Sequence, residues 1–281
     1  MGNPYPNTNG HLASVPNESH FVSLGVNKVH YITAGHGSRV LVFIHCWAGN
    51  LNFWREQLSG LADKAKLIFI DLPGHGKSDK PHTTYTIDFF ADAVLAVLRD
   101  AKVDKAVFIG HSMGGAVISQ IYNRAPEKVI ALVSVDGLLR RPSGTAEQLE
   151  ALLVPFGTPQ YLDHARTLIN TFFPIPGTET LRDRVMSEML ATPQHVMLGG
   201  MLAMFGQDQS DWKLQKVNAP IAVINAPGFL WNNGYEKYVR SLSPKTDYLI
   251  MDGVGHFPML EKPVEFNATL SAMLQKLGSL D

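Results

Sequence analysis

Ser112 is the residue of this sequence best suited to nucleophilic chemistry. It lies in the segment Gly110-His111-Ser112-Met113-Gly114, which has the form Gly-x-Ser-x-Gly. An apolar run at 105–109 precedes the segment, and a pattern typical of a helix follows it at 116–122. A serine flanked by glycines between a strand and a helix is predicted to lie in a sharp turn with its hydroxyl projecting. Such a hydroxyl attacks a carbonyl only when a base removes its proton and an acid orients that base.

His256 is the predicted base among the 11 histidines. It follows the last predicted strand after a short loop, within Gly255-His256-Phe257-Pro258, where the chain returns to the carboxyl edge of the predicted sheet. His45 ends a strand and His111 lies inside the serine turn, and both are expected to be mainly structural, with contact to substrate as the alternative role. No pair of histidines has a metal-ligand spacing such as His-Glu-x-x-His, so neither a metal nor a cofactor is predicted.

Strand patterns and helix patterns alternate along the chain. The predicted strands are 21–24, 29–33, 40–44, 67–70, 107–109, 130–135, 221–225 and 248–251. Outside residues 138–212, the predicted helices are 51–63, 87–101, 116–122, 235–242 and 264–277, and Thr86 is the predicted N-cap of the helix 87–101. This alternation predicts an α/β fold in which helices cover both faces of a mostly parallel sheet.

The segment 138–212 breaks the alternation. It has a helical pattern interrupted by six prolines, and its part 186–205 is rich in methionine. We predict a helical cap insertion at 138–212 between two parts of one core, 1–137 and 213–281. The flexible side chains of Met201 and Met204 would line an adaptable apolar pocket, although packing within the insertion is the alternative role.

Composition excludes several classes of protein. The 281 residues carry a formal net charge of −1, which provides no field to attract nucleic acid or an anionic membrane. No apolar stretch has the length of a membrane span. The single cysteine, Cys46, excludes an internal disulfide framework. The compartment stays open, either cytoplasmic or, if a leader was removed, periplasmic or secreted, and the oligomeric state is equally open.

The sequence resembles the α/β-hydrolase superfamily from about residue 21 to residue 277. The motifs that carry the resemblance are the serine turn at 110–115, His45-Cys46-Trp47-Ala48-Gly49, Asp71-Leu72-Pro73-Gly74-His75-Gly76-Lys77-Ser78 and Gly255-His256-Phe257. The resemblance implies an eight-stranded, mostly parallel sheet and a catalytic triad. It says little about the substrate, because this fold supports many chemistries.

The resemblance leaves the position of the acid to be decided. Most members carry an aspartate after the strand equivalent to 221–225, but the loop 225–233 contains no carboxylate here. Asp136, which follows the strand 130–135, matches a subset of the superfamily whose acid comes after that earlier strand. We predict Asp136 as the acid. Glu236, a site without an acid, and a structural role for Asp136 as an N-cap or ion-pair partner are the alternatives.

The resemblance also implies an oxyanion hole made by two backbone N–H groups. The residue after the nucleophile, Met113, supplies one, and Trp47 is the candidate for the other. Cys46 stands where members usually carry glycine, and its thiol is expected to be a packing group. The predicted substrate-binding residues are His45, Cys46, His111, Met201, Met204, Phe229, Trp231 and Phe257.

These features predict a serine hydrolase that cleaves a small-molecule ester or lactone with an apolar group of modest size. Ser112 would form the acyl-enzyme, with His256 as base and Asp136 as acid. Three alternatives share the same residues within this fold: a cofactor-free dioxygenase, a carbon–carbon bond hydrolase, and a ligand receptor with slow turnover.

Overall fold

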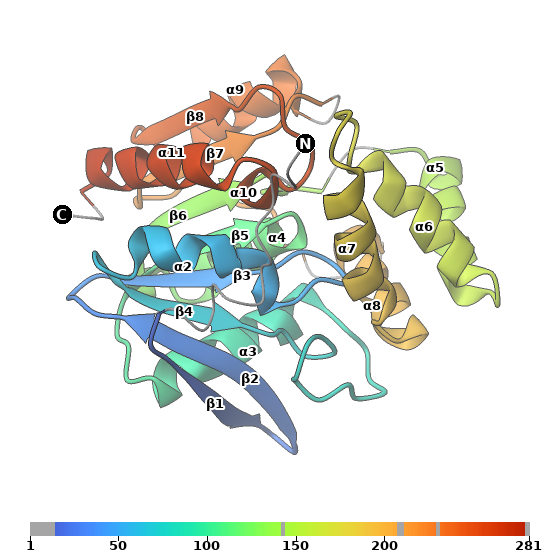
Figure 1. Cartoon of the computed structure of the whole chain (residues 1–281), viewed down its shortest axis with the longest axis horizontal. Coiled ribbons are helices and arrows are strands. Elements are labelled where there is room, and N and C mark those ends of the chain that lie inside the picture. Colours follow the sequence, from blue (N-terminus) through green and yellow to red (C-terminus); the bar gives the residue numbers. More distant parts are fainter. Residues whose placement is uncertain (1–14, 142–143, 207–210, 229–230, 279–281) are drawn as a thin grey trace, which may run out of the picture.

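A computed structural model describes residues 15–141, 144–206, 211–228 and 231–278. Eight strands form one sheet in the order β1-β2-β4-β3-β5-β6-β7-β8 (Figure 1). Strand β2 runs antiparallel to β1 and β4, and the other neighbouring strands are parallel. The predicted α/β class, with a mostly parallel sheet, is confirmed. The strands are β1 (Asn17–Leu24), β2 (Asn27–Gly35), β3 (Val40–Ile44), β4 (Lys66–Ile70), β5 (Ala106–His111), β6 (Val129–Val135), β7 (Ile221–Asn225) and β8 (Thr246–Ile250).

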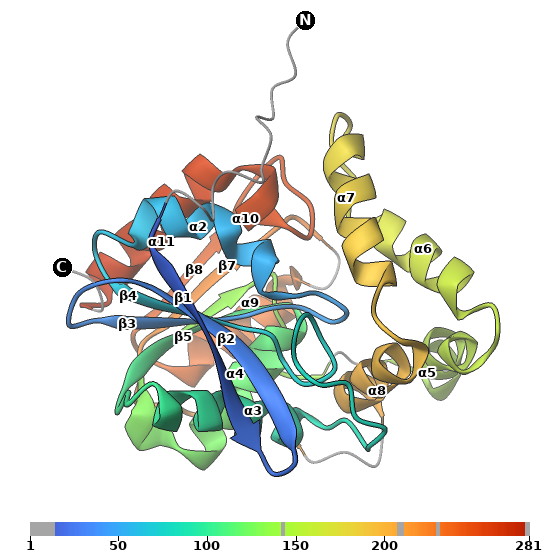
Figure 2. The same cartoon turned by 60° about the horizontal axis from the view of Figure 1, so that its bottom comes forward.

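The central strands are buried on both faces because helices cover the sheet from two sides. Helices α2 (Arg55–Leu61) and α11 (Pro263–Lys276) pack together, and so do α3 (Ile87–Asp100) and α4 (Met113–Arg124), on opposite faces (Figure 2). Every residue of β5 and β7 is buried, as expected for apolar runs in a parallel sheet. Helix α9 (Asn233–Leu242) packs against β8, and the short α10 (Pro258–Glu261) precedes α11. Among the described residues, the connections contain the single-turn helices η2 (Leu51–Trp54), η3 (Pro126–Lys128) and η4 (Val154–Gly157).

A local sequence signal marks the start of α3, but none marks the start of β1. The Thr86 side chain accepts a hydrogen bond from the N–H of Phe89 at 2.9 Å, which confirms Thr86 as the N-cap of α3. The first strand begins four residues earlier than predicted, because polar residues 17–20 pair with β2 at the edge of the sheet. Polar residues on an edge strand carry no hydrophobic alternation, so the pattern of the sequence did not reveal them.

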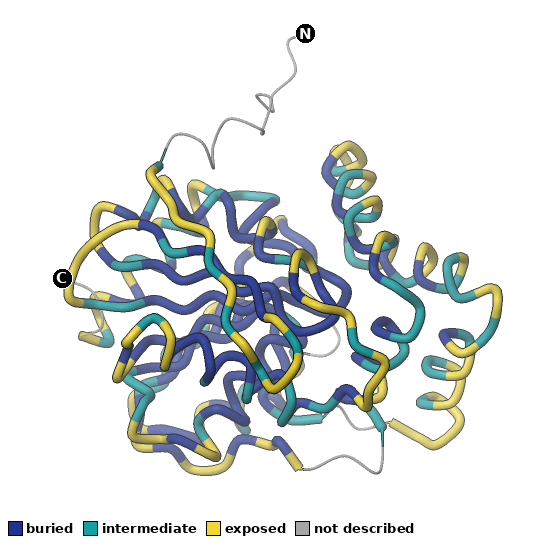
Figure 3. Tube along the Cα trace, turned by 90° about the horizontal axis from the view of Figure 1, so that it is seen from below, coloured by how far each residue is buried: buried dark blue, intermediate teal, exposed yellow. Residues whose placement is uncertain are grey.

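Between β6 and β7, four helices lie beside the carboxyl edge of the sheet (Figures 1 and 2). They are α5 (Ala146–Leu153), α6 (Tyr161–Thr171), α7 (Glu179–Leu190) and α8 (Gln194–Phe205), and we call residues 146–205, with the connections between these helices, the four-helix segment. Helices α6, α7 and α8 each have buried residues on one side and exposed residues on the other, whereas the residues of α5 are half-buried or exposed (Figure 3). In the part of the chain that the structure describes, no helix is both long and apolar enough to cross a membrane.

Candidate active site

Ser112 occupies a strained turn between β5 and α4. Its backbone has φ 53° and ψ −113°, a conformation that non-glycine residues rarely adopt. A Cβ atom at Gly110 would lie 2.2 Å from the carbonyl oxygen of Gly114, and one at Gly114 would lie 2.5 Å from that of Ile44. Both positions therefore require glycine, and this explains the Gly-x-Ser-x-Gly pattern.

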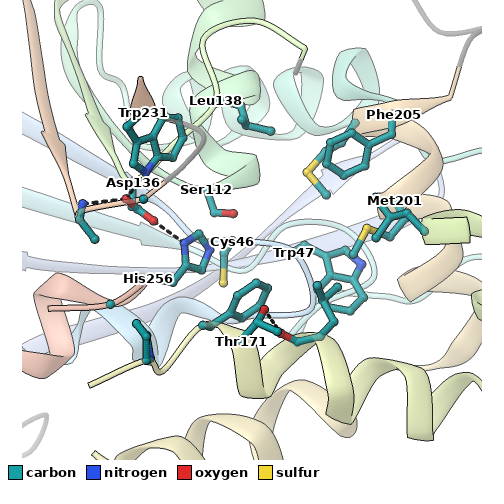
Figure 4. A pocket seen from close by; sticks show the side chains of 18 of the residues that line it. Cys46, Trp47, Ser112, Asp136, Leu138, Thr171, Met201, Phe205, Trp231 and His256 are labelled. Carbon is teal, nitrogen blue, oxygen red and sulfur yellow. Dashed lines mark hydrogen bonds and ion pairs between the residues drawn. The ribbon is translucent and has the colours of Figure 1, made fainter. Parts of the chain in front are cut away.

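Asp136 and His256 form a close pair. The Nδ1 of His256 lies 2.6 Å from Oδ2 of Asp136, while Oδ1 accepts hydrogen bonds from the N–H of Ala226 at 2.8 Å and the indole N–H of Trp231 at 2.7 Å (Figure 4). A carboxylate accepts from Nδ1–H, so Nε2 of the neutral imidazole carries the lone pair. Asp136 itself has φ 40° at the end of β6, and its side chain is buried.

Ser112 and His256 line the same cavity (Figure 4). Neither the Ser112 hydroxyl nor Nε2 of His256 makes a hydrogen bond to another of the described residues. Contacts between a nucleophile and its base are often loose in unliganded proteins and tighten when substrate binds. The two free groups face the space where a substrate would lie.

Four hydrogen bonds hold the backbone around His256. The His256 N–H donates to the carbonyl of Phe172 at 2.9 Å, and the His256 carbonyl accepts from Nε2 of His111 at 2.7 Å. The carboxylate of Glu261 accepts from the N–H groups of Gly255 and Phe257 at 2.7 and 3.0 Å. Burial raises the pKa of Glu261, and these two hydrogen bonds oppose the rise. The imidazole is thus placed by its loop as well as by Asp136.

The backbone N–H groups of Met113 and Trp47 are both available to a ligand. Met113 is the first residue of α4, where helix N–H groups lack an intrahelical partner. Neither N–H group donates to another described residue. The close approach of Gly114 to the carbonyl of Ile44 packs the start of α4 against the loop that carries Trp47. This arrangement can present two donors to an oxygen atom bound beside Ser112.

A cavity of about 610 Å³ opens in front of these residues. Its wall is mainly apolar, and the four-helix segment provides much of it: Leu149, Leu152, Leu168, Phe172, Met189, Met201, Met204 and Phe205. Among the described lining residues there is no lysine, arginine or glutamate, and the single aspartate is Asp136. The cavity suits an uncharged, largely apolar ligand.

Comparison with known proteins agrees with this geometry. Residues 39–187 match a family model described as alpha/beta hydrolase fold. The chain belongs to the α/β-hydrolase fold family. A hydrolase from Pseudomonas aeruginosa PA01 is 21% identical, with a TM-score of 0.80 over 91% of this chain and 98% of that one. A thermophilic esterase from Thermogutta terrifontis is 18% identical, with a TM-score of 0.82 over 92% and 99%.

A third solved structure is somewhat closer in sequence to this α/β-hydrolase. Est816, described as an N-acyl homoserine lactone degrading enzyme, is 27% identical, with a TM-score of 0.74 over 89% of this chain and 98% of that one. The structures below 25% identity establish the shared fold alone. Together with the family match, the similarity to Est816 supports a hydrolase.

The structure brings together some of the predicted binding residues of this α/β-hydrolase. Cys46, Met201, Met204 and Trp231 line the cavity. Burial raises the pKa of the Cys46 thiol, which keeps it protonated. Phe229 lies outside the described residues.

Three predicted binding residues lie behind the cavity wall instead. His45 accepts a hydrogen bond through Nε2 from the N–H of Leu72 at 3.0 Å, and its Nδ1 bonds to the carbonyl of Cys46 at 2.7 Å. His111 supports the His256 backbone, and Phe257 packs against Phe53. All three are fully buried and are not among the described residues that line this cavity.

Sequence reasoning missed other residues of the wall. Leu149, Leu152 and Leu168 come from α5 and α6, whose amphipathic patterns predict a buried face without indicating what covers it. The alternative acid, Glu236, pairs with Arg240 at 2.8 Å on the exposed side of α9. In the described parts of the chain, no group of three or more His, Cys, Asp or Glu residues is arranged to hold a metal ion.

Proposed function

We propose that this α/β-hydrolase cleaves uncharged carboxylic esters or lactones through an acyl-enzyme on Ser112. The observation that carries the proposal is the Asp136–His256 pair, with 2.6 Å between Oδ2 and Nδ1, beside the strained Ser112 turn. An imidazole oriented by a carboxylate is the base that activates a serine hydroxyl. The structural neighbours named as esterase and lactone-degrading enzyme agree with this reaction class.

The proposed reaction has two halves. The Ser112 Oγ attacks the acyl carbon while its proton moves to Nε2 of His256, and the N–H groups of Met113 and Trp47 bind the oxyanion. His256 then gives that proton to the leaving alkoxide, and the acyl-enzyme remains. A water molecule, deprotonated by the same Nε2, attacks the acyl carbon and releases the acid, and Ser112 regains its proton. For a lactone, the alkoxide stays attached and the product is a hydroxy acid.

The cavity favours an apolar chain on an uncharged substrate. A chain passing Trp47 toward Met201 and Phe205 would bury its methylenes against apolar side chains, each contributing about 0.8 kcal/mol. Among the described residues of the wall, a carboxylate group would find no lysine or arginine. An ammonium group would find only Asp136, whose oxygens already accept three hydrogen bonds. An uncharged acyl chain with an ester or lactone carbonyl at Ser112 therefore fits best.

Turnover of a substrate series tests the proposal. The series contains p-nitrophenyl esters of increasing chain length, γ-lactones and N-acyl homoserine lactones, each beside an anionic analogue of equal length. We expect the neutral members to be hydrolysed, the anionic ones poorly, and Ser112→Ala to lose at least about 1,000-fold in kcat. Neutral substrates hydrolysed equally well by Ser112→Ala would contradict the proposal. Metal-free oxygen uptake with a hydroxy-heteroaromatic compound, without ester turnover, would favour the dioxygenase alternative.

A further inference from the structure

The loop after β3 makes hydrogen bonds to the four-helix segment as well as to the core. The indole N–H of Trp47 donates to the carbonyl of Met197 in α8 at 2.8 Å. The hydroxyl of Thr192, between α7 and α8, donates to the carbonyl of Ala48 at 3.1 Å. The Asn50 amide donates to Glu188 of α7 at 3.0 Å. Three consecutive parts of the loop therefore each have a partner in the four-helix segment.

Ala48 has the conformation within this loop that most needs support. Its φ is 53°, in the left-handed region that an L-residue with a side chain rarely adopts. The Thr192 hydroxyl and the Ala48 carbonyl are both buried, so a carbonyl without this donor would be left unsatisfied. The N–H of Gly49 closes a turn onto the carbonyl of Cys46 at 3.1 Å. Rotation of the Ala48 carbonyl would disturb that turn, which carries Trp47.

Close packing of α8 completes the support. A Cβ atom at Gly200 would lie 2.8 Å from Cδ1 of Trp47, so the helix reaches the indole only because this position is glycine. On its other side the indole makes an edge contact with Phe156, at 5.2 Å between ring centroids. Trp47 is 3% exposed. Contacts with α8 and with Phe156 therefore fix the indole of Trp47, the residue whose backbone N–H is the proposed second oxyanion donor.

We propose that Thr192 is a positioning residue that holds the oxyanion-binding N–H of Trp47 in place from the four-helix segment. The inference rests on the proposed function, because it assigns Thr192 a task only if an oxyanion forms beside Ser112. The same segment provides much of the wall that would contact the acyl chain. The segment that would contact the acyl chain therefore also holds, through Thr192 and Trp47, the N–H group that would bind the oxyanion.

Thr192→Val tests the inference because valine keeps the shape of threonine and removes its hydroxyl. Thr178→Val is the matched control, since the Thr178 hydroxyl donates to the carbonyl of Ile175 within the same segment and touches no core residue through that bond. Thr192→Ser restores a hydroxyl. Gly200→Ala tests the second support, and its effect cannot be a loss of helix propensity, because alanine favours a helix interior more than glycine does.

The readouts separate positioning from a merely structural role. Each variant is assayed for kcat and KM on the best neutral ester. The Ki values of a trifluoromethyl ketone, which forms an oxyanion on serine, and of the matching secondary alcohol, which cannot, are also measured. We expect Thr192→Val and Gly200→Ala to lower kcat about 10-fold and to raise the Ki of the ketone by a similar factor. The Ki of the alcohol should stay unchanged, and Thr192→Ser and Thr178→Val should resemble the wild type.

Two results would overturn the inference while leaving the proposed function intact. One is a Thr192→Val enzyme with wild-type kcat and ketone Ki. The other is a parallel loss of ketone and alcohol binding with a lowered melting temperature, which would make Thr192 only a structural residue. A wild-type protein that hydrolyses no ester or lactone and binds no ketone would instead refute the proposed function, and the inference with it.

Discussion

The indole N–H of Trp231 donates to Oδ1 of Asp136 at 2.7 Å, on the side of the carboxylate opposite His256. With the N–H of Ala226 on the same oxygen, Oδ1 is fully occupied and Oδ2 is left for the imidazole. Trp231 follows β7, after which most members of the family carry their acid. In this protein that loop contains no carboxylate and instead supplies a donor to Asp136, the proposed acid at the end of the neighbouring strand, and this donor helps to fix the orientation of the carboxylate.

Trp231→Phe tests this relationship. The variant keeps an aromatic ring in the cavity wall and leaves Oδ1 with one donor. A carboxylate with one donor fewer is oriented less firmly, so it should hold the imidazole of His256 less well and kcat should fall about 3- to 10-fold. Leu149→Ala alters an apolar wall residue that makes no hydrogen bond to Asp136, so it should change KM and leave kcat close to the wild-type value. A wild-type kcat in Trp231→Phe would argue against a role in orienting Asp136.

Asp136→Asn and Glu236→Gln together test the assignment of the acid. Asparagine offers no charge and favours the wrong imidazole tautomer, so kcat of Asp136→Asn should fall about 10⁴-fold. Glu236→Gln should remain close to wild type, because Glu236 pairs with Arg240 on an exposed helix face. The measurement is kcat on one neutral ester for both variants. The opposite ranking would reject Asp136.

Much of this site was predictable because its signals are local. Five consecutive residues identify the serine turn, because the close packing at Gly110 and Gly114 leaves room for glycine alone. His256 and Asp136 follow recognisable strands, and the ends of parallel strands meet at one edge of the sheet. The structure places the two side chains in hydrogen-bonding contact, while their catalytic roles remain predictions.

The orientation of side chains near a strand end was not predictable from sequence. His111 precedes Ser112, and neighbouring residues at the end of a strand point to opposite sides, so the projection of Ser112 into the cavity turns His111 toward the backbone of His256. His45 turns inward to the N–H of Leu72. The contacts between Thr192 and Ala48, which are 144 residues apart, leave no local pattern at all.

Buried histidines make stability depend on pH. Burial lowers the pKa values of His45 and His111, and it lowers that of His75 to about 3. These histidines stay neutral in the folded protein, but in the unfolded chain they gain protons as the pH falls through about 6.5. Their contribution to the free energy of unfolding is therefore fully present above pH 6.5 and is lost as the pH falls toward 3. Each contributes up to about 1.4 kcal/mol per pH unit to the free energy of unfolding in that window.

Urea unfolding at pH 7.5, 6.0 and 5.0 measures this effect. We expect the free energy of unfolding to fall steadily below pH 6.5, and the slope to be shallower by about one proton in His75→Gln. His36→Gln, at an exposed position, is the control that should keep the wild-type slope. Equal stability of the wild type at pH 7.5 and pH 5.0 would contradict the buried, neutral state of these histidines.

Met201→Ala and Met204→Ala test whether the four-helix segment determines the preferred length of the acyl chain. Both side chains line the cavity, so their truncation should enlarge it and shift the preferred p-nitrophenyl ester toward longer chains, with a several-fold change in relative kcat/KM. Met186→Ala, on α7 but outside the wall, should keep the wild-type preference. If kcat/KM fell equally for every ester, the segment would not determine chain length.

Covalent labelling of Ser112 tests the central claim most directly. The intact mass of the wild type and of Ser112→Ala is measured after incubation with a fluorophosphonate, which reacts with activated serines. We expect one adduct per wild-type molecule and none on Ser112→Ala, because the base and the oxyanion donors act on this hydroxyl alone. An unlabelled wild type, or an adduct that persists in Ser112→Ala, would contradict a serine hydrolase mechanism at this site.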